Sequence, residues 1–407
     1  MRVHRARNVW SRAGSAPTPI SGVAEIIEEV RARGDAAVLD FTERFDHAEL
    51  APDQLVVDPN ELESAVGVLE PDVLNGLRVA IANVKAVARA QVRDEPVRVE
   101  LPEGHVVEVI ERAVRRAAVY VPGGRAPYPS TVVMGAVTAR AAGVTEICVC
   151  APPGPGGGAH PVILAACALC EVTEVYRMGG AQAIAALAYG TESVRPVDVI
   201  VGPGNPYVQE AKRQVVGQVG IDGIAGPSEL VVIASGGADP EVIALDLMAQ
   251  AEHGPDSPVW CLSPDIALLD AVTTALEERV PDGEAQLIET SDLPTALALA
   301  EEIAPEHLEL VGEEAEALAD RVRNAGCLFV GAGSATAFGD YVAGSNHVLP
   351  TGGAARFQSA LSPATFRRRM ARVSLPREAA ARLAPAGAAL ARAEGFPVHA
   401  ESMERRA

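Results

Sequence analysis

The stretch AAVYVPGGRAPYPS, residues 117–130, places two kinds of local structure side by side. Its first five residues are apolar or aromatic, which predicts a strand over 117–121. The Pro-Gly-Gly-Arg turn that follows ends this strand, and a helix is expected from Ser130. The same design recurs in strand 146–151 with a helix from Pro161, strand 174–178 with a helix after Ala183, and strand 198–201 with a helix around 207–216. Strands that alternate with helices in this way predict a parallel sheet covered by helices.

A second series of elements follows from Leu230, so we predict two α/β modules with a boundary near Pro227. Residues 20–93 have apolar side chains at helical spacing, and we expect these helices to pack on the second module. From Val97 the period becomes two, which indicates strands. The last forty residues, rich in Ala and Arg, are expected to form a small helical appendage. The second series comprises strands 230–234, 258–262 and 327–331 and helices 240–252, 265–279, 293–303 and 313–324.

The composition is typical of an α/β enzyme, with 48% hydrophobic and 4% aromatic residues among 407. A formal net charge of −20 argues against nucleic acid and against an anionic membrane surface as partners. The basic first ten residues are followed by no apolar segment, so we expect a cytoplasmic protein. All six cysteines lie in apolar surroundings, and we expect them to be reduced core residues.

Three glycine loops, residues 122–125, 179–182 and 202–205, each join a predicted strand to a predicted helix. Such loops lie at the carboxyl ends of parallel strands, where ligands bind, and helix amino termini there favour phosphate. No loop has the full G-x-G-x-x-G pattern followed by an acidic residue, so a standard dinucleotide fingerprint is absent. From the residues alone, glycines in such loops more often serve the turn than a nucleotide site.

The segment DLMAQAEHGPDS, residues 246–257, is predicted to be a helix that ends at Gly254–Pro255. Gln250 and His253 are three residues apart and would share one helix face, where an amide oxygen and an imidazole nitrogen could bind a metal. A capped surface helix with a hydrogen-bonded histidine remains the alternative.

Further titratable pairs lie in the carboxyl-terminal half of the chain. Glu306 and His307 combine two groups of different basicity, which suits proton transfer, and Pro305 would start a helix there. Asp340 lies in a Gly- and Asn-rich loop of the kind that often forms a site. Together with Gln250, His253 and His399, Asp340 would offer N and O ligands suited to zinc, and also to manganese or cobalt. His347 follows Asn346, and Glu394 precedes His399 in the tail.

Seven long motifs occur in order over nearly the whole length of the chain: YVPGGRAPYPSTVVM (120–134), RMGGAQAIAALAYGT (177–191), VGPGNPYVQEAKR (201–213), IAGPSEL (224–230), QAEHGPDS (250–257), APEHLEL (304–310) and GDYVAGSNHVLPT (339–351). Together they closely resemble the motifs of histidinol dehydrogenases. The resemblance implies an enzyme that oxidises L-histidinol to L-histidine through a bound aldehyde, with two NAD and one water.

The resemblance also implies roles for individual residues. One zinc ion per subunit would be bound by Gln250, His253, Asp340 and His399, which would also contact the substrate. His307 would be the general base and Glu306 would activate water. NAD would be contacted by Tyr120, Gln182 and Asn205. Substrate would further be bound by Ser228, His307, His347 and Glu394.

The family further implies an intertwined homodimer, in which each subunit lends its tail to the partner's site. The expected domains are a tail (1–16), an α/β domain with the metal and catalytic motifs (17–122 and 229–362), a Rossmann-like NAD-binding domain (123–228), and the helical appendage (363–407), exchanged in the dimer. Three alternatives stay open: a related dehydrogenase acting on another small amino- or sulfo-alcohol, a zinc hydrolase, and a non-catalytic two-lobed binding protein.

Overall fold

A computed structural model describes residues 2–7, 20–123, 126–278 and 284–407 of the chain. These residues form two compact units. The smaller unit comprises Gln91–Val114 and Arg367–Ala407, and the larger unit contains most of the remaining chain. Among the described helices, none is both long and apolar enough to cross a membrane.

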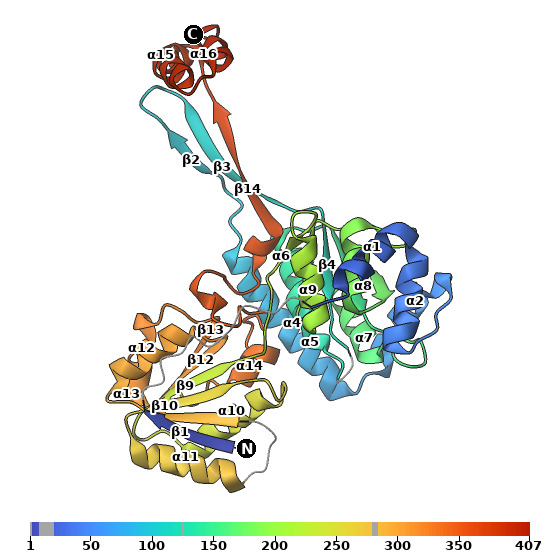
Figure 1. Ribbon diagram of the computed structural model, residues 1–407, viewed down its shortest axis with the longest axis vertical. Coiled ribbons are helices and arrows are strands. Elements are labelled where there is room, and N and C mark those ends of the chain that lie inside the picture. Colours follow the sequence, from blue (N-terminus) through green and yellow to red (C-terminus); the bar gives the residue numbers. More distant parts are fainter. Residues whose placement is uncertain (1, 8–19, 124–125, 279–283) are drawn as a thin grey trace. The chain divides into compact units, whose positions relative to one another are not determined.

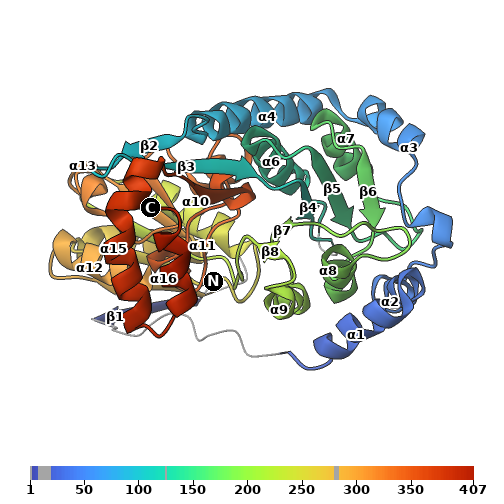
Figure 2. The same cartoon turned by 90° about the horizontal axis from the view of Figure 1, so that it is seen from above.

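The first sheet of the larger unit confirms the predicted parallel α/β module. Its five strands lie in the order β6-β5-β4-β7-β8, and each neighbouring pair is parallel. Helices cover both faces, with α6 and α7 on one side and α8 and α9 on the other (Figure 2). The strands are β4 (Arg116–Tyr120), β5 (Glu146–Ala151), β6 (Glu174–Arg177), β7 (Val199–Val201) and β8 (Gly220–Ile221). The helices are α5 (Pro129–Val132), a π-helical turn (Val133–Val137), α6 (Thr138–Ala142), α7 (Pro161–Leu169), α8 (Gly180–Tyr189) and α9 (Pro206–Val215).

The second sheet of the larger unit is also parallel, with six strands in the order β1-β11-β10-β9-β12-β13 (Figure 1). Strand β1 forms within the stretch that we expected to be a tail, and β11 was not predicted. The strands are β1 (Arg2–Arg7), β9 (Leu230–Ala234), β10 (Val259–Ser263), β11 (Glu284–Glu289), β12 (His307–Val311) and β13 (Cys327–Val330). The helices are α10 (Pro240–Ala251), α11 (Ile266–Glu278), α12 (Leu293–Ile303), α13 (Glu313–Glu316) and α14 (Thr336–Tyr341), with short 3₁₀ turns at Ala319–Arg321, Ala354–Arg356 and Pro363–Phe366.

Three predictions in this region were wrong. Pro305 does not start a helix, because every residue of β12 is buried between β9 and β13. The helix expected over 313–324 is reduced to α13 and a 3₁₀ turn. Asp340 lies in the short helix α14 and not in an irregular loop.

The amino-terminal helices pack on the first sheet, so their predicted packing on the second module was also wrong. Helix α1 (Val23–Arg33) and helix α2 (Asp35–Asp46) both pack against α8. The apolar face of α1 joins the core that contains Ala118 of β4 and Cys148 of β5. Helix α3 (Pro59–Ser64) packs on α7, and α4 (Pro71–Gln91) leads toward the smaller unit. All six cysteines are free, and five of them are buried as predicted, whereas Cys327 is only partly buried.

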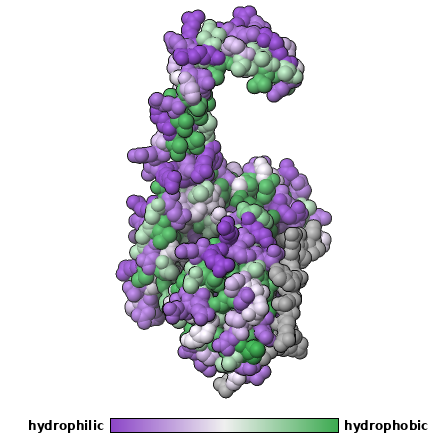
Figure 3. Space-filling view, turned by 90° about the vertical axis from the view of Figure 1, so that its left-hand side faces the viewer, coloured by the Kyte–Doolittle hydropathy of each residue, from purple (hydrophilic) through white to green (hydrophobic). Residues whose placement is uncertain are grey.

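The smaller unit combines an antiparallel sheet with two helices. Strand β3 (Val106–Ala113) pairs with β2 (Val97–Glu100) on one side and with β14 (Arg367–Ser374) on the other. Helix α15 (Arg377–Ala393) packs against α16 (Pro397–Glu404). The tail therefore contributes a strand as well as the predicted helices. Several apolar side chains of this unit are exposed (Figure 3).

Candidate active site

The larger unit contains a cavity of about 1620 Å³. From the first sheet it is lined by Tyr120, at the carboxyl end of β4, and by the 202–205 loop after β7. From the second sheet it is lined by residues that precede β9 and begin β12. The cavity therefore joins the carboxyl ends of one sheet to the amino ends of the other. It also contains His253, Asp340 and His347.

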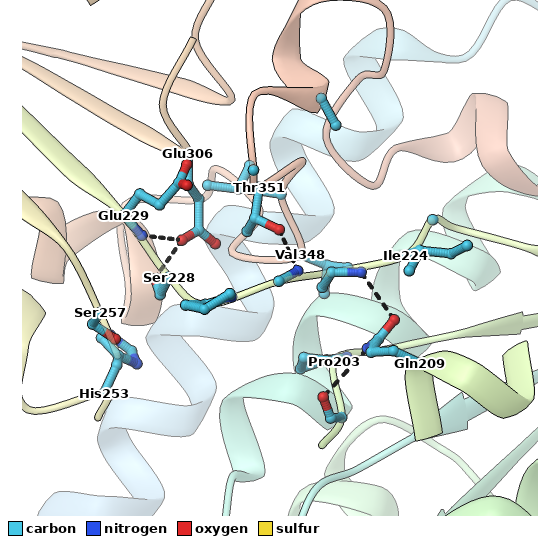
Figure 4. A pocket seen from close by; sticks show the side chains of 18 of the residues that line it. Pro203, Gln209, Ile224, Ser228, Glu229, His253, Ser257, Glu306, Val348 and Thr351 are labelled. Carbon is cyan, nitrogen blue, oxygen red and sulfur yellow. Dashed lines mark hydrogen bonds between the residues drawn. The ribbon is translucent and has the colours of Figure 1, made fainter. Parts of the chain in front are cut away.

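Glu306 is fixed by neighbours from the segment before β9. It is 6% exposed, and its Oε2 accepts hydrogen bonds from the Ser228 hydroxyl and, at 3.1 Å, from the Glu229 backbone N–H (Figure 4). The Gln250 amide Nε2 donates to Ser228 Oγ at 2.6 Å, which links helix α10 to this group. Burial raises the pKa of Glu306, against the opposing effects of His307 and Ser228.

His307 starts strand β12, and its side chain is 3% exposed. Its Nδ1 lies 3.8 Å from Glu306 Oε2, and its Nε2 lies 3.5 Å from Asp340 Oδ1. Burial alone would lower the pKa of His307, but the close contact with the Asp340 carboxylate and the charge of Glu306 outweigh it, so this pKa is raised. The imidazole is thus a buried base between two carboxyl groups.

Asp340 connects this base to two further histidines. Its Oδ2 lies 3.9 Å from His253 Nε2, and its backbone carbonyl lies 2.9 Å from His347 Nδ1. The other ring nitrogen of His347 lies 3.2 Å from Thr131 Oγ1. Burial would raise the pKa of Asp340, but its close contact with His307 and the charges of His347 and His253 lower it. Asp340 is therefore an ionised group that faces His253 and His307 together.

The side chains around Asp340 offer donor atoms that suit a divalent metal ion. Gln250 is 1% exposed, and its Oε1 has no hydrogen-bond partner among the residues that the structure describes. This amide oxygen, the His253 imidazole and the Asp340 carboxylate are oxygen and nitrogen donors of the kind that zinc accepts. Within the described part of the chain, no three His, Cys, Asp or Glu side chains are arranged to hold a metal by themselves.

Two of the predicted site residues belong to the smaller unit. Glu394 is the C-cap of α15, and His399 lies in the first turns of α16. The His399 ring stacks on Phe396, with 5.2 Å between the ring centroids. The larger unit alone brings together the remaining predicted metal and catalytic residues, namely Gln250, His253, Asp340, Glu306 and His307.

The predicted cofactor contacts lie around the glycine loops of the first sheet. The Tyr120 hydroxyl accepts a hydrogen bond from the Gly180 backbone N–H at 3.1 Å, at the start of α8. Gln182 lies in the first turn of α8, is 1% exposed, and has no partner for its amide among the described residues. The Asn205 side chain caps α9 by accepting from Val208 N at 3.1 Å. Tyr120 and Asn205 line the cavity.

Sequence reasoning missed two features of this site. Glu229 is a buried carboxyl that lines the cavity beside Glu306. Lys212 is 1% exposed, forms a buried ion pair with Asp222, and donates to the Gly202 carbonyl at 3.0 Å. Glu229 directly follows Ser228 in a motif that we quoted, and Lys212 is one of only two lysines in the chain. Those were the signals that could have revealed them.

The fold and the buried carboxyl–imidazole group define an α/β enzyme with two parallel sheets. A solved acetylating aldehyde dehydrogenase from Geobacillus thermoglucosidasius has a related fold, with a TM-score of 0.50 and 14% identity over 87% of this chain and 98% of that one. At such identity the likeness concerns the fold alone.

The chain belongs to the histidinol dehydrogenase family, a family of oxidoreductases, whose sequence model matches residues 14–407. It is 47% identical to the histidinol dehydrogenase of Parasynechococcus marenigrum, over 94% of this chain and 89% of that protein. Identity to the Cereibacter sphaeroides enzyme is 45%, over 94% and 91%. The crystal structure of histidinol dehydrogenase from Elizabethkingia anophelis superposes with a TM-score of 0.91 at 31% identity, covering 100% of this chain and 98% of that one.

Proposed function

We propose that the protein catalyses the zinc- and NAD-dependent four-electron oxidation of L-histidinol to L-histidine through bound histidinal. The observation that carries this proposal is the position of His307. Its imidazole is buried between Glu306 and Asp340 and lines a cavity that also reaches Tyr120 and the 202–205 loop. One base, one water-activating carboxyl and one cofactor region therefore open into a single space.

The metal would be held by Gln250, His253 and Asp340 of one subunit, with His399 as the fourth ligand. When bound, zinc would supply a Lewis acid that orients the amine and imidazole of the substrate. The substrate would also contact Ser228 and His347, and Glu394 would pair with its ammonium group. This ligand set and these contacts follow the family motifs.

In the first oxidation, His307 accepts the proton of the substrate hydroxyl while the hydride on the same carbon leaves to NAD. Asp340 would assist His307 in this step, because an ionised carboxylate stabilises the imidazolium that forms. Tyr120, Gln182 and Asn205 would position the cofactor. The products of this step are bound histidinal and NADH.

In the second oxidation, Glu306 removes a proton from water as the water oxygen bonds to the aldehyde carbon. The hydride of the resulting hydrate then leaves to a second NAD, and histidine forms. Ser228 suits this step because its hydroxyl fixes the Glu306 carboxyl at the edge of the cavity.

We further propose a cytoplasmic homodimer that shares its sites through the tail. The module of β4 to β8 would bind NAD, and the module of β9 to β13 would supply the metal ligands and the base. This division retains the expected roles of residues 123–228 and 229–362.

The direct test measures NADH produced by the zinc-loaded protein with histidinol. We expect two NADH for each histidinol consumed, and histidine as the product. A related dehydrogenase would instead prefer another small amino- or sulfo-alcohol offered in parallel. No NADH from histidinol in metal-loaded protein would contradict the proposal.

A further inference from the structure

A second buried glutamate lies beside the proposed water-activating carboxyl. Glu229 is 4% exposed, lines the cavity, and has no hydrogen-bond partner for its Oε2 among the residues that the structure describes. Figure 4 shows Glu229 near Glu306, whose carboxyl accepts hydrogen bonds from Ser228 and from the Glu229 backbone. A buried carboxyl oxygen without a partner is costly to maintain, so this position calls for a functional explanation.

Glu229 and Glu306 occupy matching positions in the two central strands of the sheet. They immediately precede Leu230 of β9 and His307 of β12, which are paired in register. The Glu229 backbone N–H donates to Glu306 Oε2 at 3.1 Å, and its carbonyl accepts from the His307 N–H at 3.1 Å. In return, the backbone of Glu306 faces the Glu229 carboxyl. The register of the two strands therefore places Glu229 and Glu306 side by side, each with its backbone N–H toward the carboxyl group of the other.

The groups around this pair favour movement of a proton between its members. Burial and the charge of Glu306 raise the pKa of Glu229 to about 7, while the Gly352 N–H, the Glu306 N–H and Arg356 oppose that rise. Burial and Asp340 raise the pKa of Glu306, whereas His307 and Ser228 lower it. Two buried carboxylates repel each other, so a proton gained by one lowers the cost of ionising the other.

We propose that Glu229 is the proton-relay residue of Glu306, a role that rests on the proposed function of Glu306. Glu306 takes a proton from water as the new C–O bond forms at the aldehyde carbon. In the same rate-limiting step a proton passes from Glu306 to the Glu229 carboxylate, which later releases it to solvent in the cavity. Glu306 is thereby ionised again, and the hydride leaves separately to NAD.

The test compares Glu229→Gln with the wild-type zinc-loaded enzyme, using histidinol for the first hydride transfer and supplied histidinal for the second. We expect Glu229→Gln to slow histidinal oxidation about tenfold or more and to remove an ionisation near pH 7 from its kcat profile. The first hydride transfer should stay within about twofold of wild type. Formate should partly restore histidinal oxidation in Glu229→Ala, because it supplies the missing carboxyl.

Glu309→Gln is the matched control. It removes another buried glutamate, 1% exposed and in β12, which does not line the cavity, and it should leave both half-reactions unchanged. Glu306→Gln is measured in parallel. If Glu306→Gln does not selectively slow histidinal oxidation, the proposed function of Glu306 fails. If Glu306→Gln does so and Glu229→Gln keeps the wild-type rate and pH profile, the relay is refuted.

A proton inventory on the wild-type enzyme covers the case in which the variants do not fold. The rate of histidinal oxidation is measured in mixtures of light and heavy water. A relay through Glu229 moves two protons and predicts a curved dependence on the deuterium fraction. A linear dependence, which indicates one proton in motion, would overturn the relay.

Discussion

His307 and Asp340 come from different elements of the larger unit, yet His307 Nε2 lies 3.5 Å from Asp340 Oδ1. The other oxygen of the same carboxylate lies 3.9 Å from His253 Nε2. One aspartate thus links the proposed general base to a proposed metal ligand. A substitution among the proposed metal ligands should therefore change the properties of His307, and a substitution of His307 should affect metal binding.

We predict that the protein binds one divalent metal per subunit and that His253→Ala weakens this binding by about tenfold or more, as loss of a ligand requires. Metal content after dialysis against a graded chelator measures the affinity directly. His160→Ala, which removes an α7 cap that does not line the cavity, should bind metal like the wild type. Full activity in demonstrably metal-free protein would rule out this ligand set.

Buried carboxyls in the second sheet should make stability depend on pH. Burial and the adjacent Asp246 raise the pKa of Glu309 to about 9, far above its value in the unfolded chain. Between these two pKa values the folded protein binds more protons than the unfolded chain, so the free energy of unfolding falls as pH rises. The contribution is fully present below about pH 4 and is lost progressively toward pH 9.

Glu309→Gln should flatten this fall, because an amide does not ionise. Denaturant unfolding at several pH values between about 5 and 9 measures the slope, to which one proton contributes about 1.4 kcal/mol per pH unit. The exposed Glu302→Gln should leave the slope unchanged. An equal slope in Glu309→Gln and wild type would show that Glu309 does not retain a proton.

The buried Lys212–Asp222 pair should stabilise the 202–205 loop. Lys212→Met leaves Asp222 as an uncompensated buried charge, so we expect a loss of about 3–5 kcal/mol in the free energy of unfolding and a higher KM for NAD. Lys212→Met combined with Asp222→Asn should recover part of this loss. Arg213→Met, which removes a half-exposed cation, should cost about 1 kcal/mol or less. Equal stability of the two Lys212 variants would contradict the role of the ion pair.

Mixing two inactive variants tests the shared site. If the tail acts in trans, a mixed dimer of His253→Ala and His399→Ala has one site with both lesions and one with none, so activity returns. If the tail acts in cis, both sites stay defective. A mixed dimer that is verified by mass spectrometry and has no recovered activity would place His399 in its own subunit's site.

Local patterns were enough to predict the α/β class and several elements. Strand 230–234 and helix 293–303 have the predicted bounds, because apolar runs and caps define them locally. The pairing of Glu306 with His307 as titratable neighbours was also evident from adjacency alone.

Other features depend on tertiary contacts that no local pattern contains. Pro305 suggested a helix start, but burial of β12 between two strands prevailed over that local signal. The packing of α1 on α8 and the approach of Asp340 to His307 depend on how distant segments meet. Glu229 could not be recognised as a partner of Glu306, because this requires the register of β9 against β12.

The central claim divides the chemistry between His307 and Glu306, and separate measurement of the two half-reactions tests it most directly. We expect His307→Asn to block NADH formation from histidinol, because the hydroxyl proton then has no base. Glu306→Gln should mainly slow the oxidation of supplied histidinal, by about a hundredfold or more, while the first hydride transfer persists. Loss of both half-reactions to the same extent in Glu306→Gln would contradict the account.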